Sequence, residues 1–142
     1  MNKQVVLGID IGGTNTVYGL ITKKGEVIHH ESIPTNGSLP IFDLLERLDF
    51  KVNEALSSLL EIGELVGIGI GAPNGNHFTG MIQDPPNLSW GNVDVIRLVS
   101  DRFNCKVDLT NDANAAALGE KHFGIAKDME DFVVITLGTG LG

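Results

Sequence analysis

The sequence is poor in cysteine and in basic residues. Cys105 is the only cysteine among 142 residues, so the chain can form neither an internal disulfide nor a cysteine-rich metal site. Lysine and arginine number 10 against 18 aspartates and glutamates, and the formal net charge is −8. A nucleic-acid backbone requires a basic stripe that this balance excludes. We therefore expect a small-molecule ligand and no nucleic-acid partner.

Long hydrophobic runs are absent as well. No apolar stretch is long enough to span a bilayer, and the residues after Met1 lack the regions of a secretory signal. The sequence therefore predicts a cytoplasmic protein with no membrane partner. Hydrophobic residues at 42% and charged residues at 20% are typical of one globular domain.

Three short strands begin the chain, and helices alternate with strands after them. Alternating apolar residues predict strands over 5–11, 16–22 and 27–33, which we interpret as an antiparallel meander. Later segments favour a helix from 41 to 60, strands at 65–70, 106–109 and 132–137, a polar loop at 74–92, and helices at 93–103 and 111–123. The order predicts an α/β fold with a mixed sheet and helices on both of its faces.

A glycine-rich turn follows an aspartate in the first strand. Asp10 lies in an apolar strand, where an acid needs a charge partner, hydrogen bonds or a metal. Gly12 and Gly13 allow a ligand to approach the backbone, and Thr14 and Asn15 add donors. Two interpretations remain open for this turn alone: a phosphate clamp, or a tight hairpin in which local amides satisfy Asp10.

An asparagine and an aspartate stand together where a predicted strand meets a helix. Either Asn111 or Asp112 can cap the helix. Asp112 can also accept a proton from a substrate hydroxyl that Asn111 orients. This junction, the turn after Asp10, the loop after Ile70 and the final glycines all follow strands. Open α/β sheets bind ligands at such strand ends, so we expect these loops to gather at one edge.

The last five residues, Gly-Thr-Gly-Leu-Gly, come directly after a predicted strand. No lysine follows a glycine turn at the Walker A spacing, and the third glycine is one position too early for a dinucleotide fingerprint. A further element normally follows such a loop. We therefore expect a fragment, in which residues 1–130 form one domain and 131–142 supply a strand and a glycine loop that lead into a second.

Five motifs in order resemble the ROK (repressor, open reading frame, kinase) family of sugar kinases, and the bacterial glucokinases most of all. They occupy residues 7–15, 67–76, 86–90, 111–120 and 138–142. The resemblance implies an actin-like, ribonuclease-H-like ATPase domain. It also implies an ATP-dependent hexose kinase that phosphorylates the 6-hydroxyl of glucose, inactive as this fragment alone and homodimeric as a longer protein.

The same resemblance implies residue roles. Asp10 is similar to the acid that positions the Mg²⁺ of MgATP through water, and Asp112 to the general base. The first phosphate loop is implied at Gly12, Gly13, Thr14 and Asn15, and the second at Gly138, Thr139 and Gly140. The sugar ligands are implied to be Asn111 and Asp112, with Asn74, Gly75 and Asn87 bordering the sugar.

Several departures from the family pattern keep alternatives open. The family's zinc site and Glu-Gly-His motif do not occur in this sequence, and no helix-turn-helix precedes Gln4, which disfavours the DNA-binding repressors. Many members have Pro-Gly-Pro where residues 72–75 read Ala-Pro-Asn-Gly, so the hexose is open, N-acetylglucosamine included. The rival classes are a non-catalytic sugar sensor and a dinucleotide-binding domain, which requires a helix directly after the first turn.

Overall fold

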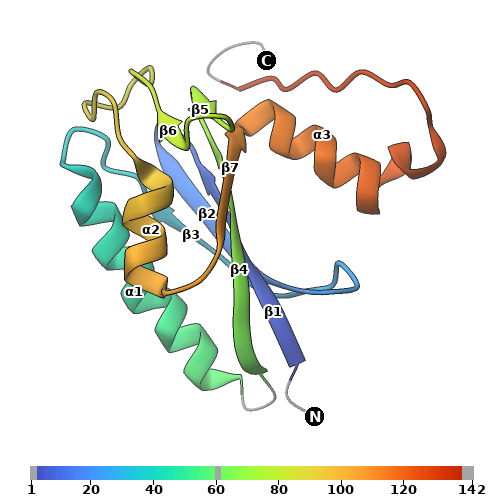
Figure 1. Cartoon of the computed structure of the whole chain (residues 1–142), viewed down its shortest axis with the longest axis horizontal. Helices are drawn as coiled ribbons and strands as arrows, with labels where there is room; N and C mark the ends of the chain where they lie inside the picture. Colours follow the sequence, from blue (N-terminus) through green and yellow to red (C-terminus); the bar gives the residue numbers. More distant parts are fainter. Residues whose placement is uncertain (1–2, 60–61, 139–142) are drawn as a thin grey trace.

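The computed structural model describes residues 3–59 and 62–138, which build a five-stranded mixed sheet (Figure 1). The strands lie in the order β3-β2-β1-β4-β7. Their bounds are Lys3–Ile11 for β1, Asn15–Thr22 for β2, Val27–Pro34 for β3, Ile62–Ala72 for β4 and Val107–Asn111 for β7. Strands β1 to β3 pair antiparallel, whereas β4 is parallel to β1 and β7 is parallel to β4. The predicted meander and mixed sheet are confirmed.

Helices cover both faces of this sheet, as expected. Helices α1 (Ile41–Ser58) and α2 (Val95–Phe103) pack on one face, and α3 (Asp112–Phe123) lies on the other, followed by the short 3₁₀ helix η1 (Ile125–Asp128) (Figure 1). The side chains that α1 buries follow the predicted helical period: Ile41, Leu44, Leu45, Leu48, Val52 and Ala55. In the described part of the chain, no helix is both long and apolar enough to cross a membrane.

The sheet has a closed face and an open face. Alternate residues of a strand point to opposite faces. In β1 the buried set, packed with α1 and α2, is Val5, Leu7, Ile9 and Ile11. The residues between them, Val6, Gly8 and Asp10, belong to the open face, where Val6 is 39% exposed. The core therefore lies between the sheet and the first two helices.

Helix α3 covers only part of the open face. A Cβ atom added at Gly71 of β4 would lie 3.0 Å from the Cβ of Ala115, so helix and strand approach closely because both residues are small. None of the α3 residues is buried, and Leu118 is 53% exposed. Much of this face, including its apolar side chains, is open to water.

One predicted strand is not formed. Residues 132–136 belong to no strand, and Val133 and Ile135 are 86% and 66% exposed. Their β-branched composition favours a strand, but a strand needs a neighbour to pair its backbone, and this segment pairs with none of the five strands of the described sheet. The strand predicted over 132–137 is therefore wrong for residues 132–136, and only Leu137 forms an isolated β-bridge.

The predicted loop over 74–92 is largely irregular and carries one small strand pair. Strands β5 (Gly75–Asn76) and β6 (Met81–Ile82) pair antiparallel within it. Three asparagines and an aspartate take left-handed backbone angles in and near this region: Asn36, Asn74, Asp84 and Asn87. Such angles are costly for residues other than glycine and concentrate at binding sites.

Candidate functional site

Three parallel strands end at the same edge of the sheet and bring the predicted site residues together. Asp10 of β1 pairs with Gly71 of β4, and Ala72 of β4 pairs with Asn111 at the end of β7. A Cβ atom at Gly71 would lie 3.5 Å from the Cα of Asp112 and 3.9 Å from an Oδ1 of Asp10. Gly71 thus lies beside both the Asp10 carboxylate and the backbone of Asp112, and the lack of a side chain there leaves room at this edge.

The two carboxylates make this edge negative. Partial burial, together with the nearby negative charge of Asp112, raises the pKa of Asp10 above its usual value of 3.8. A cation near both carboxylates would offset their mutual repulsion and the cost of burying the Asp10 charge. No group of three or more His, Cys, Asp and Glu side chains gathers anywhere in residues 3–59 and 62–138. The two carboxylates of Asp10 and Asp112 fit Mg²⁺, which is typically held by one or two carboxylates, water and substrate phosphates.

The turn between β1 and β2 presents backbone amides beside Asp10. The Gly12 amide donates to the Asn15 carbonyl at 2.9 Å, and a Cβ atom at Gly12 would lie 2.6 Å from that oxygen. Glycine is therefore required for the turn. Among the described residues, nothing accepts a hydrogen bond from the amides of Gly13 or Thr14. Free amides in a glycine turn form a concave anion site, as a phosphate clamp requires.

Asn111 begins helix α3 and uses only part of its side chain to do so. Its Oδ1 accepts hydrogen bonds from the amides of Ala113 (2.9 Å) and Asn114 (3.4 Å), so the helix cap foreseen in the sequence is confirmed. Capping occupies the oxygen and leaves the Nδ2 group able to donate to a ligand. Asp112 accepts from the Ala113 amide through one oxygen and is exposed at the same edge.

A polar hollow of about 520 Å³ adjoins the start of α3. Two of its lining residues, Asn74 and Gly75, were predicted as sugar neighbours. The other lining residues were not among the predicted sugar ligands: Asn76, His77, Phe78, Gln83, Thr110 and Asn114. The hollow forms because Gly75 packs on the end of β7, where a Cβ atom would lie 2.6 Å from the Thr110 carbonyl oxygen. Amides and a hydroxyl beside an exposed aromatic ring suit a polyhydroxyl ligand.

Two predicted site segments are placed differently. Asn87 does not line the hollow: its Cβ lies 3.5 Å from where a Cβ of Gly13 would be, beside the phosphate turn. Gly138 is exposed, and a Cβ there would touch nothing within 4 Å. Thr139 and Gly140 lie outside the described residues.

A larger hollow, of about 610 Å³, lies between the start of α1 and helix α2. Phe42, Trp90 and Arg97 are among its lining residues, and no predicted site residue is. Trp90 serves here as a loop anchor, since its Nε1 donates to the Leu39 carbonyl at 2.9 Å. The paired Asp10 and Asp112 and the free amides of the glycine turn lie at the strand ends, not in this hollow.

Known proteins similar to this chain include both kinases and regulators. The glucokinase of Halalkalibacterium halodurans is 33% identical over 147 residues, covering all of this chain and 44% of the glucokinase. The xylose repressor of Caldicellulosiruptor bescii is 34% identical over 152 residues, covering all of this chain and 37% of the repressor. A solved ROK family glucokinase from Streptomyces griseus, in complex with glucose and AMPPNP, superposes with a TM-score of 0.77 at 30% identity, covering 97% of this chain and 43% of that chain.

The chain spans less than half the length of these relatives. Glucokinases and xylose repressors both match the whole chain, so this region does not separate the two groups. The sheet and helices are those of the ROK sugar kinases, which have the actin-like ATPase fold. The model of the ROK family matches residues 6–142, and the chain therefore belongs to the ROK family.

Proposed function

We propose that the protein containing this chain is an ATP-dependent hexose kinase that phosphorylates the 6-hydroxyl of glucose. The observation that carries the proposal is that Asp10 and Asp112 meet beside Gly71, while the free amides of Gly13 and Thr14 lie in the turn that directly follows the Asp10 strand. Glucokinases match the whole chain, which supports the choice of reaction.

Phosphoryl transfer needs positioning and charge stabilisation more than covalent chemistry from the protein. The amides of Gly13 and Thr14 suit the phosphate oxygens of ATP, with the side chains of Thr14 and Asn15 nearby. Asp10 would hold Mg²⁺ through water. When bound, this ion neutralises charge on the phosphates. In the proposed arrangement Gly138, Thr139 and Gly140 form a second phosphate loop.

On the sugar side, Asp112 is the proposed general base. Its carboxylate takes the proton of the 6-hydroxyl as the oxygen attacks the γ-phosphorus, and the bond from that phosphorus to the bridging oxygen of ADP breaks. The free Nδ2 group of Asn111 orients a sugar hydroxyl, and Asn74 and Gly75 border the ring from the adjoining hollow. Asn87 lies nearer the phosphate turn, so we place it at the junction between sugar and phosphate.

The domain arrangement, compartment and assembly belong to the same proposal. Residues 1–130 form the actin-like domain, and 131–142 lead into a second domain that closes over sugar and nucleotide, in a cytoplasmic homodimer. Closure excludes water, which otherwise competes with the 6-hydroxyl. On this view residues 1–142 alone do not turn over substrate.

The direct test is product analysis with the intact protein that contains this chain. Glucose, N-acetylglucosamine, mannose and fructose are each offered with MgATP, and phosphorus NMR follows the products. We expect glucose 6-phosphate with stoichiometric ADP. Formation of no sugar phosphate from any of these hexoses, in a protein shown to be folded, would refute the kinase proposal.

A sugar-responsive regulator is the second candidate, because xylose repressors match the whole chain. It predicts sugar binding without turnover. Calorimetric titration with glucose and xylose in the absence of nucleotide separates the two: a kinase binds glucose and consumes ATP when both are present, whereas a regulator binds sugar and leaves ATP intact.

A further inference from the structure

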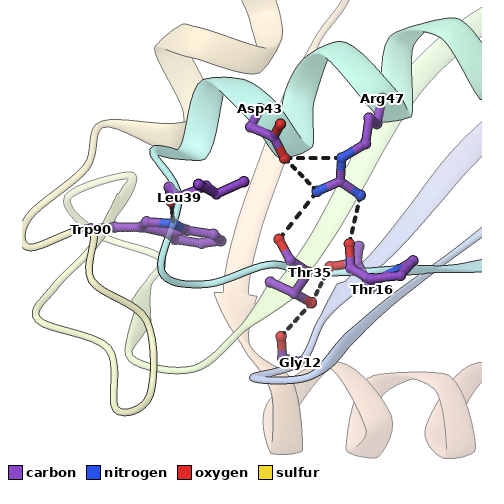
Figure 2. Close-up of polar contacts among 8 residues, drawn as sticks. Gly12, Thr16, Thr35, Leu39, Asp43, Arg47 and Trp90 are labelled. Atoms are coloured by element: carbon purple, nitrogen blue, oxygen red, sulfur yellow. Dashed lines mark hydrogen bonds and ion pairs between the residues drawn. The ribbon is translucent and has the colours of Figure 1, made fainter.

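Two threonine hydroxyls are buried behind the phosphate turn. Thr16 and Thr35 are 0% and 1% exposed, and they are the polar residues found buried in the described chain. Their hydroxyl oxygens lie 2.9 Å apart, and the Thr35 hydroxyl donates to the Gly12 carbonyl at 2.7 Å (Figure 2). Buried polar groups are costly unless they form hydrogen bonds. The two threonine hydroxyls meet this requirement by bonding to each other and to the turn.

Thr35 holds the turn at two points. Besides the hydroxyl contact to Gly12, its backbone amide donates to the Thr14 carbonyl at 2.8 Å. The carbonyl of one residue and the amide of the next point in opposite directions across a trans peptide plane. Holding the Gly12 carbonyl toward Thr35 therefore turns the Gly13 amide away from the protein, toward the place where a phosphate would lie.

Arg47 fastens Thr35 to helix α1. Its guanidinium donates to the carbonyls of Pro34 (2.6 Å) and Thr35 (3.3 Å), and it pairs with Asp43 at 2.7 Å (Figure 2). Arginine remains charged at all working pH values, and its planar fork suits several acceptors at once. The segment 34–40, which we call the strap, is thus attached at its start to the most deeply buried helix.

The other end of the strap holds the loop that contains Asn87. The Ser89 amide donates to the Gly37 carbonyl at 2.7 Å, and Trp90 donates to the Leu39 carbonyl. Gly37 allows this contact, because a Cβ atom there would lie 2.4 Å from a methyl group of Leu88. The strap therefore connects the phosphate turn with the loop beside it.

We propose that Thr35 is a positioning residue for phosphate binding, which sets the direction of the turn's amides from behind, and that Arg47 locks Thr35 in place. The expected effect of Thr35 on ATP binding rests on the proposed function. The structural content of the inference, that the Thr35 hydroxyl fixes the turn, does not depend on the substrate.

The first test uses residues 1–142, labelled with ¹⁵N, and measures amide exchange at Gly12. Thr35→Val removes the hydroxyl at nearly constant volume, and Thr35→Ser restores it. Tyr18→Phe is the matched control, because it removes another hydroxyl bond from the buried face of β2, that to Glu31 at 2.6 Å. We expect exchange of the Gly12 amide to become about tenfold faster in Thr35→Val, because that change removes one buried hydrogen bond. The exchange rate should not change in Thr35→Ser or Tyr18→Phe.

The second test uses kinetics of the intact protein. Thr35→Val is expected to raise KM for ATP about tenfold with KM for glucose within about twofold, and Thr35→Ser to return both values to those of the parent protein. Arg47→Lys, which keeps the charge but not the fork, changes the same parameters by a smaller factor. A merely structural residue would lower the amount of folded enzyme without a selective change in KM for ATP.

The outcomes separate this proposal from the previous one. If Gly12 exchange in Thr35→Val equals that of Tyr18→Phe, Thr35 does not position the turn, whatever the enzyme does. If the protein phosphorylates no hexose but Gly12 exchange responds as expected, the kinase proposal fails while the positioning role remains. Should Thr35→Val not fold, Arg47→Lys decides the question by the same exchange measurement.

Discussion

The two faces of the sheet differ in what covers them. On the closed face, α1 buries six side chains against alternate residues of β1, whereas on the open face α3 buries none. Yet Asp10, Gly71 and Asp112, the residues of the proposed chemistry, belong to the open face or its edge. The packed core thus lies on one face of the sheet, and the proposed catalytic residues lie on the other face or at its edge. The hydrogen bonds of Thr35 and Arg47 connect helix α1 of the core with the glycine turn of the proposed site.

The largest expected effect concerns the open edge. Asp112→Asn in the intact protein should lower kcat about a thousandfold, since the amide cannot accept the hydroxyl proton, while KM for the sugar changes little. Steady-state kinetics with glucose and MgATP check this. Asp108→Asn, an exposed change on the neighbouring strand β7, is the control. Turnover near that of the parent protein would remove Asp112 from the role of base.

The closed face should dominate stability. Leu48→Ala deletes a completely buried side chain of α1 and should lower the free energy of unfolding by about 3 kcal/mol. The matched change on the open face, Leu118→Ala, affects a side chain that is 53% exposed and should cost under about 0.5 kcal/mol. Urea unfolding of residues 1–142 measures both. Equal losses would contradict the difference between the faces.

Disturbing the contact between α3 and β4 should cost an intermediate amount of stability. Gly71→Val adds atoms where a Cβ alone would already lie 3.0 Å from Ala115, so the helix must move away at a cost of about 1–3 kcal/mol. Gly69→Val is the control, because nothing lies within 4 Å of a Cβ there. Thermal unfolding compares the two variants, and a smaller loss for Gly71→Val than for Gly69→Val would contradict the packing of α3.

The smallest effect is a gain in stability. The pKa of Asp10 is raised in the folded chain, so between 3.8 and that higher value the native state binds more protons than the unfolded state. Stability therefore falls as pH rises through this window, and the loss persists above it. Asp10→Asn should stabilise the chain by a few tenths of a kcal/mol at pH 7, since solvent still screens this partly buried group, and by nothing below pH 3.8.

Urea unfolding at pH 7 and pH 3.5 checks that prediction, with the exposed Asp131→Asn as control. In the intact protein the same Asp10→Asn change should reduce kinase activity, because it weakens the proposed hold on Mg²⁺. A variant that is less stable than the parent at pH 7 would show that Asp10 is satisfied by local hydrogen bonds, which is the hairpin interpretation of the turn.

Local patterns in the sequence predicted much of the fold. The meander, helix α1 and the strand-end loops follow from alternation, helical period and glycine turns, and the structure confirms them. Strand β4 is longer than predicted, Ile62–Ala72 rather than 65–70, because its glycines interrupt the apolar signal on the open face. The segment 132–136 shows the limit of propensity: β-branched residues form no strand without a partner.

The hydrogen bonds behind the site could not be read from the sequence. Thr35 contacts Gly12, 23 positions earlier, and Arg47 reaches two backbone carbonyls that no side-chain pattern marks. The helix cap at Asn111 could be predicted, because a cap depends only on residues that are close in sequence. Its oxygen caps the helix while its Nδ2 group remains able to bind a ligand, so both predicted roles are compatible. Thr110, Gln83 and Asn114 line the polar hollow only because separate segments meet there.

The strap has a consequence for how this chain can vary in length. Surface connections usually tolerate insertions, but between 34 and 40 four carbonyls are held from outside the strap. Those of Pro34 and Thr35 accept from Arg47, that of Gly37 accepts from the Ser89 amide, and that of Leu39 accepts from Trp90. One added residue would put these contacts out of register. A library of single-residue insertions should therefore yield folded proteins at the 23–26 hairpin turn and none within 36–38.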